Sequence, residues 1–308
     1  KAGTDAKQIV KLNIVAVTQE AMEAAVLKIE DRYPPAHRPV LSRVIGQLSN
    51  PDAVVAIDAV AAVSQSPSEV QLILTSETNL VGAILPIGPR AYISGQAEKG
   101  ATPAAATANT IASLKRTLEF LGAKPTDIVQ AKCFLTPMTA AAAVTREFDK
   151  AFGPNKVPLV FVEWKSTLPI EIEMITACPP GKPTTPSLEF LTPPGMTAPT
   201  IYCRVARVVC PTQWYLPGLV SRKPGSGEEQ VTDIFDQLRE TLEPHGSDFR
   251  HLVKATYYVS ADDASQKLNE LRPRYYDPKR PPAASKAMVP GVGTRNRSIA
   301  IDMIAVPK

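Results

Sequence analysis

Three segments of the chain share one pattern, and this internal repetition constrains the fold more than any other feature of the sequence. Each segment begins with acidic or polar residues, continues with an apolar pair, and ends in a run of β-branched or aromatic residues that predicts a strand. The matched residues Val10, Val129 and Val253 are 119 and 124 residues apart, about the length of one small domain. The segments are DAKQIVKLNIVAVT (5–18), PTDIVQAKCFLTPM (125–138) and DFRHLVKATYYVSA (248–261).

The elements after each segment repeat as well. A helix is predicted next, then a strand, and finally a strand in which apolar and polar residues alternate, as expected when one sheet face is buried and the other is wetter. Asp58, Glu173 and Asp302 occupy matching places in the alternating strands. The predicted helices are 20–33, 140–152 and 264–276, the middle strands are 38–48, 156–164 and 283–291, and the alternating strands are 54–63, 169–178 and 298–307.

Two of the three repeats also have a front half, which we predict to be a strand pair followed by a long amphipathic helix. The predicted pairs are 70–75 with 90–96 and 200–209 with 214–221, and the helices are 102–123 and 227–246. The chain therefore divides into a half unit (1–65), a whole unit (68–180) and a second whole unit (185–308), joined by the linkers 64–69 and 178–187. A half unit leaves one apolar face of its sheet uncovered and one edge strand unpaired. We therefore expect the first unit to lack its hairpin and helix, or to receive them from an N-terminal piece outside this sequence.

Composition excludes several classes of protein. With 308 residues, 44% hydrophobic and 21% charged, the chain can bury a large core and is not disordered overall. No run of 18 apolar residues is present, so no membrane span is predicted. A net charge of +4 neither demands nor excludes an anionic partner. The chain starts at Lys1 without signal-peptide features, so we expect a processed, truncated or fragmentary chain whose compartment cannot be read, with the cytoplasm as the default.

The cysteines and histidines do not indicate a metal site. Four cysteines are too few for a disulfide-built scaffold, and they lie in or beside apolar runs, which favours buried reduced thiols. No CxxC pair exists, and the three histidines lack metal-ligand spacing. We therefore expect no metal site.

Four stretches together resemble the RidA/YjgF family, which is also labelled endoribonuclease L-PSP. The resemblance covers nearly the whole chain, is closest in the middle unit, and rests on the order and spacing of the stretches rather than on any single motif. They are YISGQ (92–96), GAKPTDIVQAKCFLT (122–136), FDKAFG (148–153) and LPIEIEMI (168–175).

The resemblance implies an α+β, chorismate-mutase-like fold in which each unit is a sheet backed by two helices. Three family units normally pack as a trimer with clefts between neighbours. Three units in one chain then imply an intramolecular pseudo-trimer, which avoids the concentration dependence of assembly and replaces three equal clefts by three that differ.

The resemblance also implies chemistry. Family enzymes hydrolyse reactive enamines and imines to ketoacids without a cofactor, and an arginine in a Pro-Ala-Arg-Ser-Cys-Val segment holds the carboxylate of the substrate. In this sequence Leu41, Leu159 and Ala284 stand at the arginine place, so the usual anion anchor is missing from all three units. Arg43 and Lys286, two places further along and on the same strand face, are candidate replacements for substrate binding. A solvated or interface charge is the competing interpretation for both.

The middle unit keeps the other parts of such a site. Glu171 matches the working carboxylate of the family, whereas the other units have alanine there, and Ser94, Gly95 and Gln96 match its Ser-Gly-Gln strand end. We predict Glu171 and Ser94 as catalytic residues, and Gly95 and Gln96 as substrate-binding residues. Glu171 is equally compatible with a polar face packed against a neighbouring unit, and Ser94 with a bond to the backbone.

Three functions remain open at this point. The first is a cofactor-independent deaminase or hydrolase acting on small imine-type metabolites at an inter-unit cleft. The second is a non-catalytic small-molecule-binding or scaffolding pseudo-trimer, since fold does not imply function. The third, RNA binding, rests on a pI of about 8.8 and on the basic and aromatic stretch 272–282. We do not expect it, because arginines at a helix C-terminus and tyrosines that close a core explain the stretch.

Overall fold

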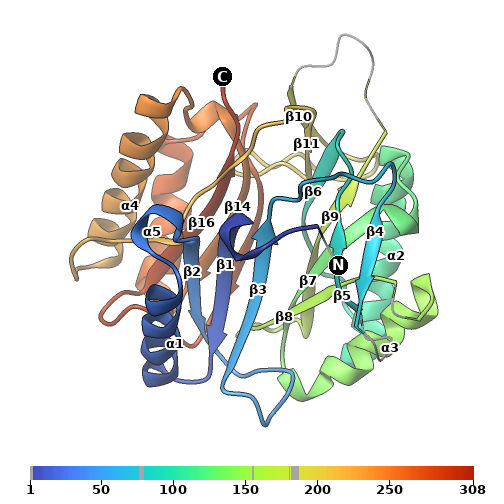
Figure 1. The fold of residues 1–308 in the computed structure, drawn as a ribbon, viewed down its shortest axis with the longest axis horizontal. Helices are drawn as coiled ribbons and strands as arrows, with labels where there is room; N and C mark the ends of the chain where they lie inside the picture. Colours follow the sequence, from blue (N-terminus) through green and yellow to red (C-terminus); the bar gives the residue numbers. More distant parts are fainter. Residues whose placement is uncertain (1–2, 76–79, 155, 180, 182–186) are drawn as a thin grey trace.

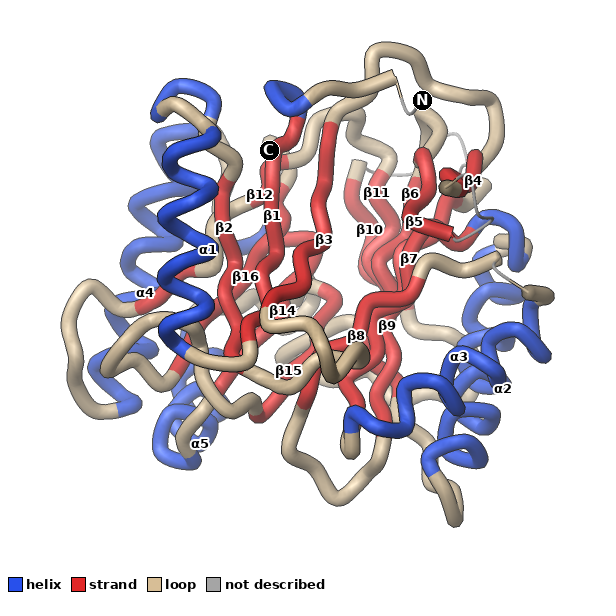
Figure 2. The backbone as a smooth tube through the Cα atoms, turned by 60° about the horizontal axis from the view of Figure 1, so that its bottom comes forward, coloured by secondary structure: helices blue, strands red, loops and turns tan. Residues whose placement is uncertain are grey.

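The computed structural model describes the chain except for residues 1–2, 76–79, 155, 180 and 182–186. The fold is α+β. In Figure 1 helices α1, α4 and α5 lie on one side of the molecule and α2 and α3 on the other, with the strands between them. Figure 2 shows the same separation from a second direction. No helix in the described residues is both long and apolar enough to cross a bilayer.

The first part of the chain forms a three-stranded sheet in the order β2-β1-β3, with β1 parallel to β2 and antiparallel to β3. Helix α1 begins at Thr18, whose hydroxyl accepts a hydrogen bond from the backbone N–H of Ala21 and so caps the helix. It buries Met22 and Ile29 against the apolar face of β1. The elements are β1 (Ile9–Ala16), α1 (Gln19–Arg32), β2 (Val40–Ile45) and β3 (Val55–Ala61).

The middle part forms most of a six-stranded sheet in the order β10-β11-β6-β9-β7-β8. Helix α2 is capped by Thr102 and ends at Gly122, whose φ of +67° favours glycine. The apolar faces of α2 and α3 pack on one face of this sheet. The elements are β6 (Arg90–Gln96), α2 (Pro103–Leu121), β7 (Ile128–Leu135), α3 (Ala141–Phe152), β8 (Leu159–Glu163) and β9 (Ile170–Ala177).

The last part forms a five-stranded sheet in the order β12-β16-β14-β15, with β13 also paired to β16. Helix α4 starts with a capping box in which Ser226 and Glu229 satisfy each other's backbone N–H groups. The elements are β12 (Trp214–Tyr215), β13 (Leu219–Val220), α4 (Gly227–Leu242), β14 (Leu252–Val259), α5 (Asp262–Leu271), β15 (Ala283–Met288) and β16 (Ile299–Ala305).

Both predicted front strand pairs are wrong. Strand β4 (Gln71–Leu74) pairs with β5 (Leu80–Ile84) instead of β6, and β11 (Val205–Val208) pairs with β10 (Leu188–Leu191) and β6 instead of residues 214–221. Burial explains the second change, since Val205 and Ala206 become fully buried once β11 joins β6. Several apolar strands have a similar pattern, so a given strand could pair with more than one sheet edge. The sequence alone does not indicate which edge it pairs with.

The three sheets share one register. Val15 lies opposite Ala56, Phe134 opposite Glu171, and Tyr258 opposite Ala300, in each case on the antiparallel neighbour. In the parallel pairs Leu41, Leu159 and Ala284 lie beside Leu12, Ala131 and Ala255 respectively. The members on β1, β7 and β14 keep the separations of 119 and 124 residues read from the sequence, and each matched position has the matched partner in its own sheet.

One core cluster joins the three sheets. It contains the equivalent residues Val15, Phe134 and Tyr258 together with Trp164. The ring centroid of Phe134 lies 6.5 Å from that of Tyr258 and 6.3 Å from that of Trp164, within the range of favourable aromatic pairs. The equivalent strand residues therefore converge on a shared apolar centre.

Two buried ion pairs also cross between sheets. Lys11 of the three-stranded sheet pairs with Asp302 of the five-stranded sheet, and Ser42 donates to the same carboxylate at 2.9 Å. Lys254 of the five-stranded sheet donates to Glu173 of the six-stranded sheet at 2.5 Å. Both partners of each pair are buried and have lost their hydration. Removing one partner would leave the other as an unpaired buried charge, which destabilises the fold.

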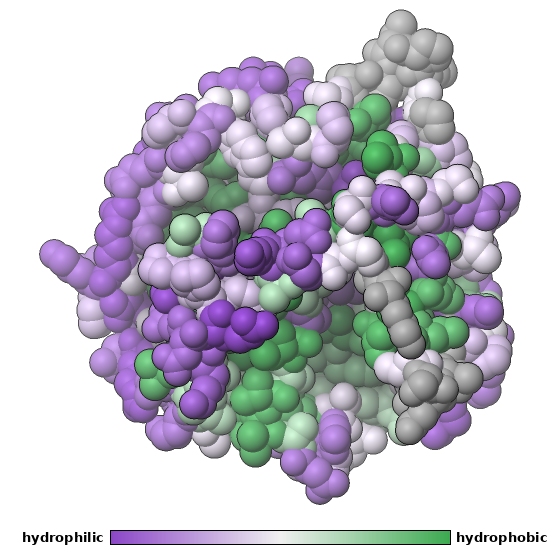
Figure 3. Space-filling model, viewed as in Figure 1, coloured by the Kyte–Doolittle hydropathy of each residue, from purple (hydrophilic) through white to green (hydrophobic). Residues whose placement is uncertain are grey.

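On the face of the three-stranded sheet that α1 covers, the part beside β3 remains exposed. Ile57 is 51% exposed, whereas the equivalent residues Ile172 and Ile301 are fully buried in the cores that include α2 and α4. Leu27 of α1 and Val54 before β3 are each 61% exposed. Figure 3 shows hydrophobic surface in the lower centre of this view of the molecule. The expected N-terminal hairpin and helix that would cover this face stay a prediction.

The unequal cover of three equivalent isoleucines gives a direct test by urea unfolding. Ile172→Ala and Ile301→Ala each remove buried methyl groups and should lower the free energy of unfolding by about 2–5 kcal/mol. Ile57→Ala should cost about 1 kcal/mol or less, because half of that side chain already meets water. Equal losses at the three positions would show that the face of the three-stranded sheet is covered in solution.

Candidate functional site

The predicted site residue Ser94 lies where β6 of the six-stranded sheet meets β15 of the five-stranded sheet. Its hydroxyl donates to the carbonyl of Cys203 at 2.6 Å and accepts from the backbone N–H of Ala284 at 2.7 Å. Ser94 is 1% exposed. Ser94 therefore fastens β6 to β15, and both bonds would have to open before its hydroxyl could reach a substrate.

Glu171 lies directly beside Gly95. A Cβ atom on Gly95 would stand 2.0 Å from Oε1 of Glu171, so only glycine leaves room for this carboxyl group. The pairing of β6 with β9 is interrupted between Ile93 and Gln96, which places Gly95 in an irregular stretch. Oε1 of Glu171 is buried and makes no hydrogen bond to the part of the chain that the structure describes.

The surroundings of Glu171 favour its protonated form. Burial, followed by the negative charge of Glu173, raises the pKa of Glu171 to about 7, while the Ser285 hydroxyl and the charge of Lys254 act in the opposite direction. A buried carboxyl group that titrates near neutral pH can both give and take a proton.

Glu173, two residues further on the same strand face, stays ionised. Burial alone would raise the pKa of Glu173, but the ammonium groups of Lys254 and Lys132 outweigh it and hold the pKa below its usual value. The distances from the two lysine Nζ atoms to the Glu173 carboxylate are 2.5 and 3.6 Å respectively. The two neighbouring carboxyl groups are thus driven in opposite directions by their environments, an arrangement found at acid–base sites.

Gln96 faces away from this group. Its side-chain amide donates to Oγ1 of Thr117 on α2 at 2.9 Å, and it is 6% exposed. Gln96 therefore contacts the helix layer, whereas Gly95 contacts Glu171. Of the Ser-Gly-Gln stretch, Gly95 is the member that touches the candidate acid.

The two candidate replacement cations also lie elsewhere. Lys286 of β15 donates to Oγ of Ser265 at 3.1 Å and to Oδ1 of Asn269 at 3.2 Å, both on α5. Arg43 of β2 packs against Gly293. The cation whose charge acts on Glu171 is Lys254, which is already engaged with Glu173.

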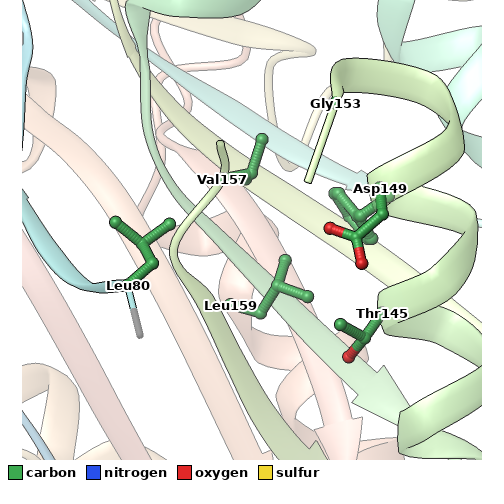
Figure 4. A pocket seen from close by; sticks show the side chains of 7 residues that line it. Leu80, Thr145, Asp149, Gly153, Val157 and Leu159 are labelled. Carbon is green, nitrogen blue, oxygen red and sulfur yellow. The ribbon is translucent and has the colours of Figure 1, made fainter. Parts of the chain in front are cut away.

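Two of the three positions at which the resemblance would place an arginine lie at junctions between sheets. The backbone N–H of Ala284 donates to the Ser94 hydroxyl, and the carbonyl of Leu41 accepts from the backbone N–H of Gly218 at 2.8 Å. The third place, Leu159, lines a cavity of about 160 Å³ between β5 and α3 that shares no residue with the Glu171 group (Figure 4). The remaining lining residues are Leu80, Thr145, Phe148, Asp149, Gly153 and Val157.

Sequence reasoning missed Lys254, Lys132 and Ser285, which set the charge around Glu171 and Glu173. A signal was present, because Lys254 occupies the repeat position of Lys11, and both lysines interrupt apolar strands. Unpaired lysines are rarely buried, so each implies a carboxylate partner. Which carboxylate it would be depends on how the sheets pack.

The cysteines agree with the prediction of reduced thiols. The four are free, with Cys133, Cys178 and Cys203 buried. No group of three or more potential metal ligands occurs among the described residues.

Comparison with known proteins finds a family match in the last part of the chain. Residues 218–307, from the junction glycine to the end of β16, match the family model described as endoribonuclease L-PSP. The match lies on the five-stranded sheet, whereas the sequence motifs were closest in the middle unit. No curated protein matches the chain.

Solved structures that resemble the chain each correspond to about a third of it. A YjgF-family protein from Neisseria meningitidis is 20% identical and covers 39% of this chain and 95% of its own, with a TM-score of 0.30. A putative endoribonuclease from Thermotoga maritima is 28% identical, covering 33% and 84%, with a TM-score of 0.29. A Rid-family protein of unknown function from Yersinia pestis is 20% identical, covering 35% and 98%, with a TM-score of 0.31. The match at residues 218–307 relates this last part of the chain to the family described as endoribonuclease L-PSP.

Proposed function

We propose that the chain is one RidA-like module written three times, with boundaries 1–65, 68–180 and 185–308, packed as an intramolecular pseudo-trimer. Three observations support this arrangement. The sheets keep a common register, the equivalent residues Val15, Phe134 and Tyr258 share a core, and the ion pairs Lys11–Asp302 and Lys254–Glu173 use equivalent lysines and equivalent acids. A single chain then makes contacts that separate subunits make in a trimer.

The mass of the chain in solution tests this arrangement. Sedimentation equilibrium should give a minimal assembly of one chain, 33.1 kDa, because the inter-unit contacts are satisfied within it. A minimal assembly of three chains would contradict the proposal.

We propose further that the chain is a cofactor-independent hydrolase for small imine or enamine metabolites, with Glu171 as the group that transfers protons. The observation that carries this is the buried Glu171 carboxyl group against Gly95, with one oxygen unpartnered in the described structure and a pKa raised to about 7. The family relationship gives the reaction class.

The chemistry assigns two steps to Glu171. In the first, water adds to the carbon of a protonated imine, the carboxylate takes a proton from that water, and the nitrogen becomes a neutral amine as the C=N π bond breaks. In the second, the carboxyl group gives its proton to the amine nitrogen, the C–N bond breaks to release ammonia, and the carboxylate takes back the hydroxyl proton as the carbonyl forms. The carboxyl group then returns that proton to solvent. The arginine place holds Ala284 at this junction. We therefore expect substrates whose binding does not require a carboxylate to be held at that place.

The alternative, a non-catalytic scaffold, also has specific support. Ser94 is engaged on both sides by structural hydrogen bonds, and Leu41 and Ala284 make apolar or backbone contacts where the family arginine would stand. RNA binding has weaker support, because Arg272 and Tyr276 of the basic stretch are each 5% exposed and pack in the core of the last sheet.

The raised pKa of Glu171 predicts how stability depends on pH. Between pH 4.5, the ordinary carboxyl pKa, and about pH 7, Glu171 is protonated in the folded chain but ionised in the unfolded chain. The free energy of unfolding therefore falls progressively as the pH rises through that window. Glu171→Gln removes the effect. Relative to wild type, this variant should gain about 3 kcal/mol in unfolding free energy between pH 4 and pH 8.

Urea midpoints of both proteins across that pH range measure the difference. Glu119→Gln, on the exposed face of α2, is the matched control and should follow wild type at each pH. A difference between Glu171→Gln and wild type that does not change with pH would contradict the raised pKa.

Release of ammonia from a panel of imines with and without a carboxylate group, generated in the assay, tests the activity. Glu171→Gln should lose about a hundredfold or more of the wild-type rate, as expected for loss of a general acid–base group, while Glu119→Gln keeps the rate. Equal background rates in wild type and Glu171→Gln would reject the hydrolase for that panel and favour the scaffold.

A further inference from the structure

We propose that Arg272 and Lys286 form an oxyanion-binding site on the helix side of the five-stranded sheet, for the carboxylate or phosphate group of a small metabolite. The site comprises these two cations with Asn269 and Ser265 of α5. It lies away from Glu171 and does not depend on the proposed hydrolase.

Hydrogen bonds bring the two cations together. Nζ of Lys286 lies 3.2 Å from Oδ1 of Asn269, and Nη2 of Arg272 lies 3.4 Å from the same oxygen. Nζ of Lys286 also lies 3.1 Å from Oγ of Ser265. Two positive groups thus share one neutral acceptor, a position that a negatively charged oxygen would fill more favourably.

Arg272 is nearly buried without a counter-charge. It is 5% exposed, its Nε makes no hydrogen bond within the described residues, and its guanidinium lies 4.9 Å from the ring centroid of Tyr257. Stacking on the ring stabilises the cation but does not neutralise it. An arginine desolvated in this way favours a bound anion.

The other buried cations show what is missing here. Lys11, Lys132 and Lys254 each have a carboxylate within 4 Å, supplied by Asp302 or Glu173. Neither Arg272 nor Lys286 forms an ion pair with any carboxylate in the part of the chain that the structure describes.

The nearby acids of α5 are directed elsewhere. Glu270 pairs with Lys267 and Arg274, and Asp263 accepts from the backbone N–H of Gly227 at the start of α4. The neighbouring polar groups on β14 and after α5 are the hydroxyls of Tyr257 and Tyr276, which bond each other at 2.5 Å. These groups supply no negative side chain to the pair of cations.

The site is open at one end. Asn269 is exposed and Lys286 is half-buried, so an anion can enter from solvent, with Lys286 at the mouth and Arg272 deeper. Ser285, the neighbour of Lys286 on β15, acts on Glu171 from the opposite strand face. Anion binding and proton transfer are therefore assigned to opposite faces of the same strand.

Titration with inorganic phosphate and with acetate, each at constant ionic strength set with sodium chloride, tests the site by calorimetry. Binding of phosphate but not acetate would assign the site to phosphate groups, and the reverse to carboxylates. Lys286→Gln should lower the affinity for the anion by about tenfold or more, as expected for loss of one charged hydrogen bond. Lys279→Gln removes the same charge from an exposed position in the loop before β15 and should bind as wild type does.

A second variant supplies the missing charge from the protein itself. Asn269→Asp places a carboxylate between the two cations, so it should raise the melting temperature without added anion and abolish binding of the titrated anion. Binding of neither anion, equal affinities in wild type and Lys286→Gln, or a melting temperature that Asn269→Asp leaves unchanged or lowers would each overturn the proposal.

Discussion

Burial of equivalent strand faces against one another is the constraint on which the rest of this structure depends. Val15, Phe134 and Tyr258 lie on the matched strands β1, β7 and β14 of three different sheets, and they belong to one apolar cluster. Charged residues lie beside this cluster, and their desolvation demands close pairing of lysine with carboxylate. Apolar contact brings the sheets together, and the ion pairs restrict how they align, because a shifted sheet would leave buried charges without partners.

The same constraint produces the unusual state of Glu171. Lys254 and Lys132 are both drawn to Glu173, so the neighbouring carboxyl group is left with burial and a negative neighbour, which together raise its pKa. Gly95 provides the space for that carboxyl group, and Ser94 closes the junction with Ala284. A carboxyl group that can exchange protons near neutral pH thus arises from the packing of two sheets, without a metal ligand cluster in the described residues.

Charge balance distinguishes the two cationic regions of the molecule. Around the shared core, lysines and carboxylates offset each other, and the contacts hold sheets together. Behind β15, Arg272 and Lys286 have neutral partners, Asn269 and Ser265. The first arrangement suits a permanent protein contact, whereas the second leaves a positive charge for a ligand from solvent. Ala284 and Lys286 lie on the same face of β15, so the proposed anion site shares that face, whereas Ser285 faces the opposite side.

Local patterns in the sequence predict helices α1 to α5, most of the strands, the repetition at 119 and 124 residues and the matching places of Asp58, Glu173 and Asp302, because periodicity and spacing are local properties, but they do not predict strands β5 and β10. The sequence also identified Glu171, Gly95 and Ser94 as residues of one region. Only the packing of the sheets and helices determines that β11 pairs with β6, that Gln96 and Lys286 face helices, and that Lys254 forms an ion pair with Glu173 rather than with Glu171. Those outcomes depend on which of several similar strand edges pair and on which of several charged side chains approach each other between sheets. Such contacts join residues far apart in the chain, so no local sequence pattern predicts them.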